Sequence, residues 1–227
     1  MKMSENERPE IKVPCETHII CVLLLDTSGS MGGVGVDGMR PIDSLNRSVM
    51  EFQKEICKDE MAKRTIDVAI VKFDDTVEMV APFTPVEDME YSPQVAKGRT
   101  CMGTAIIKAI DLIKERVQAY NCLAVSYFSP LIIMVTKGES TDSIKEAIER
   151  VQEEKSKRRL LFITIAPPGA NKETLLRIAP VIEHSDEAFD WLAFSLIHRS
   201  FWLHDPRRFD NEPLIIEYDS SLRTLEF

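Results

Sequence analysis

The sequence predicts an α/β fold: a doubly wound, mostly parallel central sheet with helices on both faces. Short, purely apolar runs alternate along the chain with longer segments in which apolar residues recur every three or four positions. The runs are continuous rather than alternating, which is typical of strands buried on both faces. Strands and helices that alternate in this way favour parallel strands joined by helical crossovers.

Three parts are predicted along the 227 residues. Residues 1–16 are polar and contain two prolines, so they are expected to form a loose lead-in. Residues 17–200 carry the strand and helix pattern and are long enough for one large domain. Residues 201–227 break the pattern, and their two apolar clusters, Phe201–Leu203 and Leu214–Ile216, either pack back on the domain or dock on a partner.

The strands of the sheet centre are the purely apolar runs, residues 19–25 and 131–135, and the run of residues 160–165, in which Thr164 is the one polar residue. Residues 67–73 form a further strand, followed after a two-residue turn by the alternating segment 76–80. A link this short indicates an antiparallel hairpin, with its second strand at the sheet edge. Residues 82–98 hold three prolines and are predicted to form a loop, while residues 181–182 are consistent with another edge strand.

The helices are predicted from apolar residues at spacings of three and four, which give a helix one apolar face. This spacing holds around residues 42–58, 106–117, 144–151, 175–178 and 189–196. Ser143 and Glu146, at the start of the third of these segments, have capping-box spacing. We therefore expect the Ser143 side chain to cap the first turn of that helix.

Charge and composition exclude several classes of function. The net charge of −9 and the pI near 5.1 argue against a general binder of nucleic-acid backbones. The longest purely apolar run, residues 19–25, is far shorter than the ~20 residues needed to cross a bilayer. The first eighteen residues lack the apolar stretch of a secretory signal, and the five cysteines show no metal-ligand spacing. We therefore expect a cytoplasmic protein with neither nucleic-acid nor membrane partners.

A group of short, oxygen-bearing side chains follows the first strand. Asp26, Ser28 and Ser30 stand at alternate positions, and Gly29 allows the loop between them to turn tightly. In doubly wound sheets, ligands bind at the carboxyl ends of the strands, where this loop is expected to lie. Hard oxygen ligands of this kind suit a divalent cation such as Mg²⁺ or Mn²⁺. The alternative is a hydrogen-bonded turn without a ligand.

These residues resemble the D-x-S-x-S motif that opens the metal-ion-dependent adhesion site of the von Willebrand factor A family. Two later segments resemble the family as well: Gly98–Ile106 is similar to its G-G-T-x-x-G-x-A-L segment, and Met134–Ser140 is similar to its L-T-D-G loop. The resemblance covers about residues 17–200 and is nearest to single-domain bacterial members of the tellurite-resistance TerY type. It implies a protein-binding domain whose metal ligands are Asp26, Ser28, Ser30 and Thr100.

Lys137 stands where the family has an aspartate, and Arg99 stands where it has a glycine. With a divalent ion bound, the formal charges of Asp26, Lys137 and the ion sum to +2, whereas Asp26 and Lys137 alone cancel. An ion and an ammonium ~5 Å apart repel by on the order of 6 kcal/mol at an effective dielectric near 20. We therefore expect Mg²⁺ or Mn²⁺ to bind weakly or not at all, with the Lys137 ammonium paired with Asp26. Two alternatives stay open: Lys137 turns to solvent beside an ordinary metal, or Glu139 supplies a carboxylate.

The predicted function is that of a non-enzymatic protein-binding module. No serine and histidine have the spacing of a catalytic pair, and neither a G-x-S-x-G nor an H-E-x-x-H motif is present. We expect Lys137, Arg99 and Glu139 to face the partner, with Lys97 extending a positive rim that recognises an acidic residue. The alternative is a structural subunit of a larger complex that docks through residues 201–227, and a hydrolase is a remote third alternative.

The resemblance also implies a biological setting. Bacterial relatives of this kind are associated with stress and tellurite-resistance systems, often beside kinases or phosphatases. A kinase or phosphatase is therefore a candidate partner in a bacterial stress or signalling system. Neither the identity of the partner nor the oligomeric state follows from the sequence.

Overall fold

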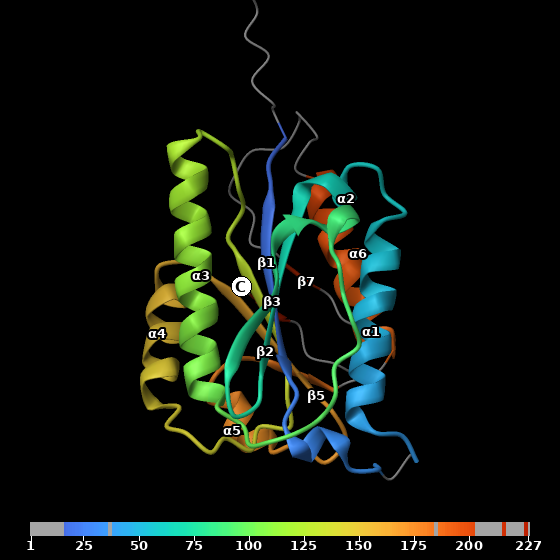
Figure 1. Ribbon diagram of the computed structural model, residues 1–227. Helices are drawn as coiled ribbons and strands as arrows, with labels where there is room; N and C mark the ends of the chain where they lie inside the picture. The colour runs from blue at the N-terminus through green and yellow to red at the C-terminus, as the bar shows by residue number, and fades with distance from the viewer. Residues whose placement is uncertain (1–15, 36–37, 184–185, 203–214, 217–224, 227) are drawn as a thin grey trace, which may run out of the picture.

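The computed structural model describes residues 16–35, 38–183, 186–202, 215–216 and 225–226. Nearly all of the predicted lead-in and most of the predicted extension lie outside these ranges, including Leu203 and Leu214 of its two apolar clusters. The three-part division therefore remains a prediction. Within the described residues, helices pack on both faces of one central sheet (Figure 1), and a separate antiparallel pair joins β7 (Ile215–Ile216) to β8 (Leu225–Glu226).

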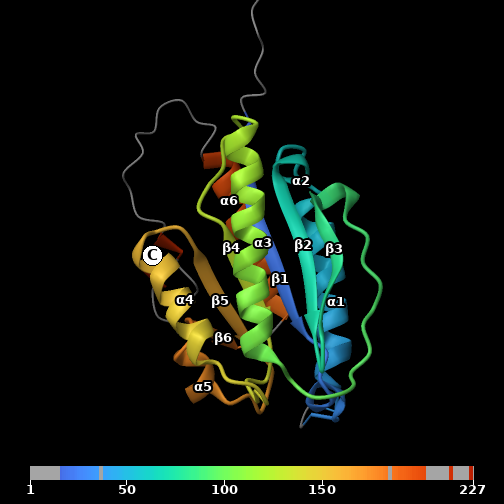
Figure 2. The ribbon, with the colours of Figure 1, turned by 60° about the vertical axis from the view of Figure 1, so that its left-hand side comes forward.

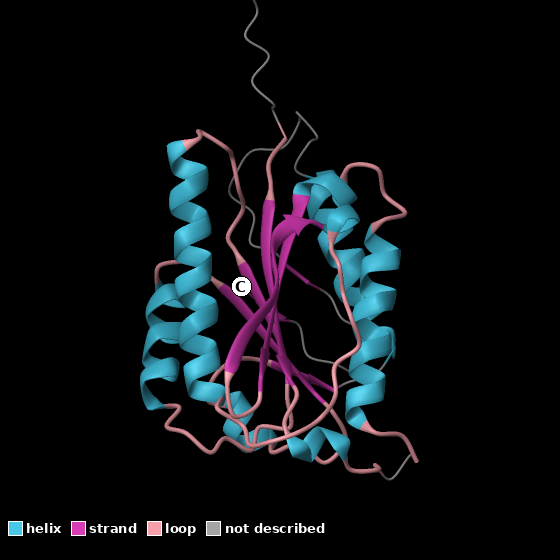
Figure 3. Cartoon of the chain, viewed as in Figure 1, coloured by secondary structure: helices cyan, strands magenta, loops and turns pink. Residues whose placement is uncertain are grey.

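Six strands form the central sheet, in the order β3-β2-β1-β4-β5-β6. Their bounds are β1 (Ile19–Asp26), β2 (Ile66–Phe73), β3 (Val77–Pro85), β4 (Leu131–Val135), β5 (Leu161–Ala166) and β6 (Val181–Glu183). All neighbours run parallel except β2 and β3, which form an antiparallel hairpin. From β1 the chain builds the sheet first toward β3 and then, through β4, toward β6. The predicted doubly wound, mostly parallel α/β fold is confirmed (Figure 3).

Two layers of helices cover the sheet, one on each face (Figure 2). On one face lie α1 (Pro41–Ile56), α2 (Ala62–Thr65) and α6 (Asp186–Trp202). On the other lie α3 (Met102–Cys122), α4 (Lys145–Ser156) and α5 (Lys172–Leu176). Among the described residues, no helix is both long and apolar enough to span a membrane.

The residues of β1 show why both faces need a helical layer. All eight are buried. Ile20 and Leu24 pack into the core beneath α3 and α4, whereas Leu23 and Leu25 pack into the core beneath α1 and α6. Burying one such side chain stabilises the fold by roughly 1.5–3 kcal/mol, so the strand is stable only when it is covered on both sides. This covering holds the carboxyl end of β1 in a fixed position.

The edge strand β3 is longer than the sequence pattern indicates. It runs to Pro85, so residues 82–85 of the predicted loop belong to the strand and that part of the prediction is wrong. Pro82 and Pro85 are tolerated because an edge strand has one side without ladder partners, where a missing N–H breaks no hydrogen bond. Two register shifts between β2 and β3 mark bulges along this edge.

Helix ends differ from the predicted ones in two places. α4 begins at Lys145 with Ile144 at its N-cap and no side-chain hydrogen bond there, so the predicted Ser143 capping box is wrong. α6 continues to Trp202, past the expected domain boundary at residue 200. The first two residues assigned to the extension therefore continue the last helix of the domain.

Candidate functional site

Two loops are joined by backbone hydrogen bonds at the edge of the sheet where β1 ends. They are the loop after β1 and the loop that leads into α3 (Figure 1). The backbone N–H of Lys97 donates to the carbonyl of Thr27 at 2.8 Å. The N–H of Gly29 donates to the carbonyl of Gly98 at 3.0 Å. The segment with the D-x-S-x-S motif and the segment with Thr100 are thus held against each other, as the sequence predicts.

Gly98 allows this close approach. Its φ of +69° lies in the left-handed region, and a Cβ at this position would lie 2.2 Å from Oδ2 of Asp75. A side chain would therefore be strained and would displace Asp75. A Cβ at Gly29 would in turn lie 3.2 Å from the Gly98 carbonyl oxygen, so both glycines contribute to the contact between the loops.

Asp26, the last residue of β1, holds its carboxylate inside the protein. The residue is 0% exposed. Its Oδ1 accepts the backbone N–H of Ser28 at 2.8 Å, and its Oδ2 accepts the hydroxyl of Thr136 at 2.6 Å. Burial raises the pKa of Asp26, while donors from Thr136, Ser28 and the backbone N–H of Lys137 oppose that rise. The carboxylate is thus fixed between the loop after β1 and the loop after β4.

The two serines of the motif lie next to each other. The hydroxyls of Ser28 and Ser30 are 3.1 Å apart and share a hydrogen bond. Ser28 is buried, whereas Ser30 is half-buried and begins the opening toward solvent. A single 3₁₀ turn, Gly29–Gly32, brings Ser30 back beside Ser28. Two hydroxyl oxygens and a carboxylate therefore come from five consecutive residues.

Thr100 lies just before α3 and is 4% exposed. Its carbonyl accepts the backbone N–H of Thr141 at 2.8 Å and the Thr141 hydroxyl at 3.0 Å. These bonds tie the loop after β4 to the loop before α3. The hydroxyl of Thr100 makes no hydrogen bond to any residue that the structure describes, so it remains available as an oxygen ligand.

Asp142, which the sequence analysis missed, caps α3 from a distance. Its carboxylate accepts the backbone N–H groups of Gly103 at 2.9 Å and Thr104 at 2.8 Å, and it accepts the Ser140 hydroxyl at 2.6 Å. Burial acts to raise the pKa of Asp142, but these hydrogen bonds outweigh it and the pKa is lowered. A cap that lies 39 residues along the chain leaves no local signal in the sequence.

Lys137 lies at the site, but not in the predicted ion pair. Its ammonium is 3.4 Å from the carbonyl oxygen of Ser30, and it forms no ion pair with Asp26, although the structure describes both residues. Thr136, a residue that the sequence analysis did not assign to the site, takes that place at the carboxylate. The N–H of Asn171 donates to the carbonyl of Lys137 at 2.7 Å and holds its backbone.

Arg99 and Glu139 are both exposed at the same edge. The backbone N–H of Arg99 donates to Asp75 at 3.1 Å, but its guanidinium makes no ion pair within the described part of the chain. The Glu139 carboxylate likewise makes no ion pair there. Lys97, also exposed, has no carboxylate partner among the described residues. The rim of the site therefore carries three positive side chains, and Glu139 is an exposed acid beside them.

The donor set fits a hard divalent cation in kind but not in charge. Hydroxyl and carboxylate oxygens are the ligands that Mg²⁺ and Mn²⁺ take. Only Asp26 brings a negative charge, and both of its oxygens already accept hydrogen bonds. Within the described ranges, no three His, Cys, Asp or Glu side chains form a group that could hold a metal ion. A cation here would depend largely on neutral hydroxyls, with an ammonium nearby.

Comparison with solved structures finds the same fold in bacterial proteins. The vWF domain of the type V pili tip protein Mfa5 from Porphyromonas gingivalis is 11% identical, with a TM-score of 0.56 over 87% of this chain and 98% of that chain. An aerotolerance-related membrane protein from Bacteroides fragilis is 16% identical, with a TM-score of 0.56 over 80% of this chain and 99% of that chain. The PilB minor pilin from Streptococcus sanguinis is 12% identical, with a TM-score of 0.58 over 86% of this chain and 64% of that chain. At these identities the likeness shows the fold alone.

Comparison with curated protein sequences finds no match. In contrast, the family model of the von Willebrand factor type A domain matches residues 21–194, most of the chain. The doubly wound sheet and the loop motif at its edge agree with that match. The chain belongs to the von Willebrand factor type A domain family, whose members are generally non-enzymatic protein-interaction modules.

Proposed function

We propose that the loop edge binds an acidic side chain of a partner protein, and that Lys137 and Arg99 supply positive charge for this contact. The observation that carries the proposal is the set of three cations, Lys97, Arg99 and Lys137, that have no carboxylate partner among the described residues. The Lys137 ammonium lies beside the loop that carries the Ser28 and Ser30 hydroxyls, and Lys97 and Arg99 belong to the loop that is hydrogen-bonded to it. A carboxylate of the partner would pair with these cations.

Several other cations of this acidic chain pair with carboxylates within the fold. Lys72 pairs with Glu78 at 2.8 Å, and Arg150 pairs with both Asp111 and Glu146 at 3.0 Å. Cations without such partners keep their full field toward solvent. On a protein of net charge −9, a local positive rim favours an acidic partner over other surfaces of this chain.

A metal ion enters this proposal in a secondary role. The hydroxyls of Ser28, Ser30 and Thr100, with the Asp26 carboxylate, are the groups that would hold Mg²⁺ or Mn²⁺. A bound cation would offer the partner carboxylate an open coordination position. Lys137 lowers the affinity for that cation, because its ammonium lies beside the same loop. The rim cations therefore give the site an attraction for carboxylates that does not depend on metal.

The test selects ligands of the loop edge from random sequences, so it works before the partner has been identified. A random peptide library displayed on phage is selected on the immobilised full chain, once with EDTA and once with MgCl₂. We expect the selected peptides to share an aspartate or glutamate. Replacing that residue by its amide should weaken binding at least tenfold, the loss typical of a charge-assisted contact.

Variants of the protein locate the contact. Lys137→Gln and Arg99→Gln should each weaken peptide binding at least tenfold, whereas Lys54→Gln, an exposed cation at the far end of α1, should leave it unchanged. Circular dichroism confirms that all three variants fold. Selected peptides without acidic residues, or peptides that bind the Lys137 and Arg99 variants as tightly as the native protein, would overturn the proposal.

The finer features of the function rest on the family resemblance. They comprise a TerY-like place within the family, a bacterial stress or signalling role, a cytoplasmic location, and a kinase or phosphatase as the partner. If acidic peptides are selected, their sequences can be compared with the surface segments of such enzymes. A structural subunit that docks through residues 201–227 remains the alternative, and it predicts that the selected peptides bind independently of Lys137.

A further inference from the structure

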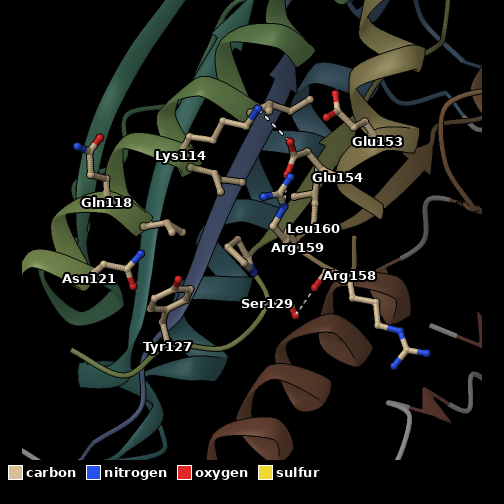
Figure 4. A pocket seen from close by; sticks show the side chains of 14 residues that line it. Lys114, Gln118, Asn121, Tyr127, Ser129, Glu153, Glu154, Arg158, Arg159 and Leu160 are labelled. Carbon is tan, nitrogen blue, oxygen red and sulfur yellow. Dashed lines mark hydrogen bonds and ion pairs between the residues drawn. The ribbon is translucent and has the colours of Figure 1, made fainter. Parts of the chain in front are cut away.

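A pocket of about 610 Å³ lies between α3 and α4, away from the loop edge (Figure 4). Pro130 and Leu160, which directly precede β4 and β5, line it, so it lies at the amino ends of these strands. The loop edge lies at their carboxyl ends. The volume is in the range of sites that enclose small organic ligands. Neither the metal motif nor the positive rim includes any residue of this lining.

The floor of the pocket is apolar. Ile110 and Ile113 of α3 and Leu160 are at most 4% exposed, and their side chains belong to the core beneath α3 and α4. Val117 and Pro130 complete this surface. A ligand with a hydrocarbon body would therefore contact the hydrophobic core directly and release water from it.

Two cations at one end of the pocket share a single carboxylate. Glu154, which is only 6% exposed, lies 3.0 Å from the ammonium of Lys114 and 3.1 Å from Nε of Arg159. Glu153, the other acid of the lining, is paired with Lys157. The Glu154 carboxylate is buried, but the side chains of Lys114 and Arg159 are 51% and 56% exposed. At this open end of the pocket the two cations therefore outnumber the carboxylate that they share.

The Arg159 guanidinium is held in place with free donors. Its Nε pairs with Glu154, whereas its terminal N–H groups make no hydrogen bond to any described residue, and Figure 4 shows the group turned toward Glu154 and Lys114 over the pocket. The backbone N–H of Arg159 also donates to the Glu154 carbonyl at 2.9 Å. Main chain and side chain are thus tied to the same residue. A fork of donors fixed in this way matches the geometry of a carboxylate.

A glycine-like turn sets this arrangement. Arg158 follows α4 with a φ of +53°, and its N–H donates to the Lys155 carbonyl at 2.9 Å. Together with the bond from Arg159 to Glu154, this is the Schellman pattern, in which glycine normally occupies the position of Arg158. The negative end of the α4 dipole favours cations here, which accounts for the charges but not for the pocket beside them.

We propose that this pocket binds a small organic acid. Its carboxylate would lie on the guanidinium of Arg159 and the ammonium of Lys114, and its hydrocarbon body would lie on Ile110, Ile113 and Val117. Asn121 and Tyr127 lie toward the other end of the pocket in Figure 4, and their side chains make no hydrogen bond to the described residues. They would receive a polar group at the far end of the ligand. This site is independent of the proposed function of the loop edge.

Octanoate is the probe, because it combines both halves of the proposed ligand. Acetate has the carboxylate without the hydrocarbon body, and 1-octanol has the body without the charge. Titrations of the full chain are followed by ¹H–¹⁵N spectra, with affinity measured by calorimetry. We expect octanoate to shift the amides of α3 and of residues 158–160, and to bind at least tenfold more tightly than either fragment.

Two matched variants decide the role of the charge. Arg159→Gln should weaken octanoate binding at least tenfold, whereas Arg150→Gln, which breaks the bridge from α4 to Asp111 outside the pocket, should not. Equal affinity for octanoate and octanol, shifts confined to other surfaces, or equal binding by both variants would overturn the proposal. So would an apolar tetrapeptide that binds here through its C-terminal carboxylate while octanoate does not, because the occupant would then be a protein end.

Discussion

Replacing Lys137 by aspartate tests the electrostatics of the loop edge most directly. The Lys137 ammonium lies 3.4 Å from the Ser30 carbonyl, beside the loop that carries the Ser28 and Ser30 hydroxyls. A divalent ion on those hydroxyls would have this ammonium as a close neighbour. The substitution removes that repulsion and adds a second carboxylate to the one that Asp26 provides.

The expected gain follows from Coulomb's law. A divalent ion and an ammonium ~5 Å apart repel by on the order of 6 kcal/mol at an effective dielectric near 20. Lys137 is half-buried and its stem can swing toward solvent, which relieves part of this repulsion. If about half remains, ~3 kcal/mol, the dissociation constant for the metal falls more than a hundredfold.

Calorimetric titration with MnCl₂ and MgCl₂ measures this gain. Lys137→Asn has nearly the size of the aspartate without its charge, so it separates removal of the ammonium from addition of the carboxylate. The affinity should rise from the native chain to Lys137→Asn and again to Lys137→Asp. Lys54→Asp makes the same change of charge on α1 and should have no effect. Submillimolar affinity in the native chain, or no gain for Lys137→Asp, would refute the reasoning.

Three further substitutions test the supporting structure by urea denaturation. Asp142→Ala should lower the free energy of unfolding by ~1–2 kcal/mol, because it removes the cap of α3. The pKa of Asp142 is lowered from 3.8, so its stabilising effect is present above that pH and is lost as the pH falls through the folded-state pKa. The free energies of unfolding of the native protein and the variant should therefore converge in acid. A difference that stays constant with pH would contradict the assignment. Arg158→Gly should raise the free energy of unfolding by ~0.5–1 kcal/mol, because glycine adopts the positive φ without strain, and a loss of stability would count against the Schellman turn. Gly98→Ala should lower the free energy of unfolding by ~2 kcal/mol, because the position has a φ of +69° and the new Cβ would clash with Asp75. Gly33→Ala is the control and should be nearly neutral, because Gly33 has a φ of −71° and open space around its Cβ. Equal effects of the two substitutions would show that the contact between the loops does not depend on Gly98.

Local patterns in the sequence were sufficient to predict the strands and the first loop. A strand with helices on both faces must be apolar at every position, and residues 19–25 are. Asp26, Ser28 and Ser30 were found because their spacing lies within five residues and follows such a strand. Thr100 was reached through the family resemblance. The bonds from Lys97 to Thr27 and from Thr141 to Thr100 agree with the prediction that the loop after β1, the loop before α3 and the loop after β4 meet.

Contacts between distant segments could not be predicted in the same way. Whether Thr136 or Lys137 reaches the Asp26 carboxylate depends on which way successive side chains point at the end of β4. The hydroxyl of Thr136 makes this contact, so a hydrogen bond from an uncharged donor stands in place of the predicted ion pair. The cap that Asp142 provides likewise exists only because the loop after β4 passes over the start of α3. Both contacts form because the order of the strands brings these distant segments of the chain together.

The loop edge and the pocket can be tested separately because α3 holds them apart. The helix begins at Met102, beside the loop edge, and Val117 lines the pocket. Fifteen residues at a rise of 1.5 Å place these positions about 22 Å from each other. Substitutions more than ~10 Å apart without shared partners act additively. Failure of octanoate to bind would therefore not contradict the proposal for the positive rim, and failure of the acidic peptides to bind would not contradict the proposal for the pocket. If saturating octanoate changed the affinity for a selected peptide, α3 would have to adopt two arrangements that the two ligands distinguish.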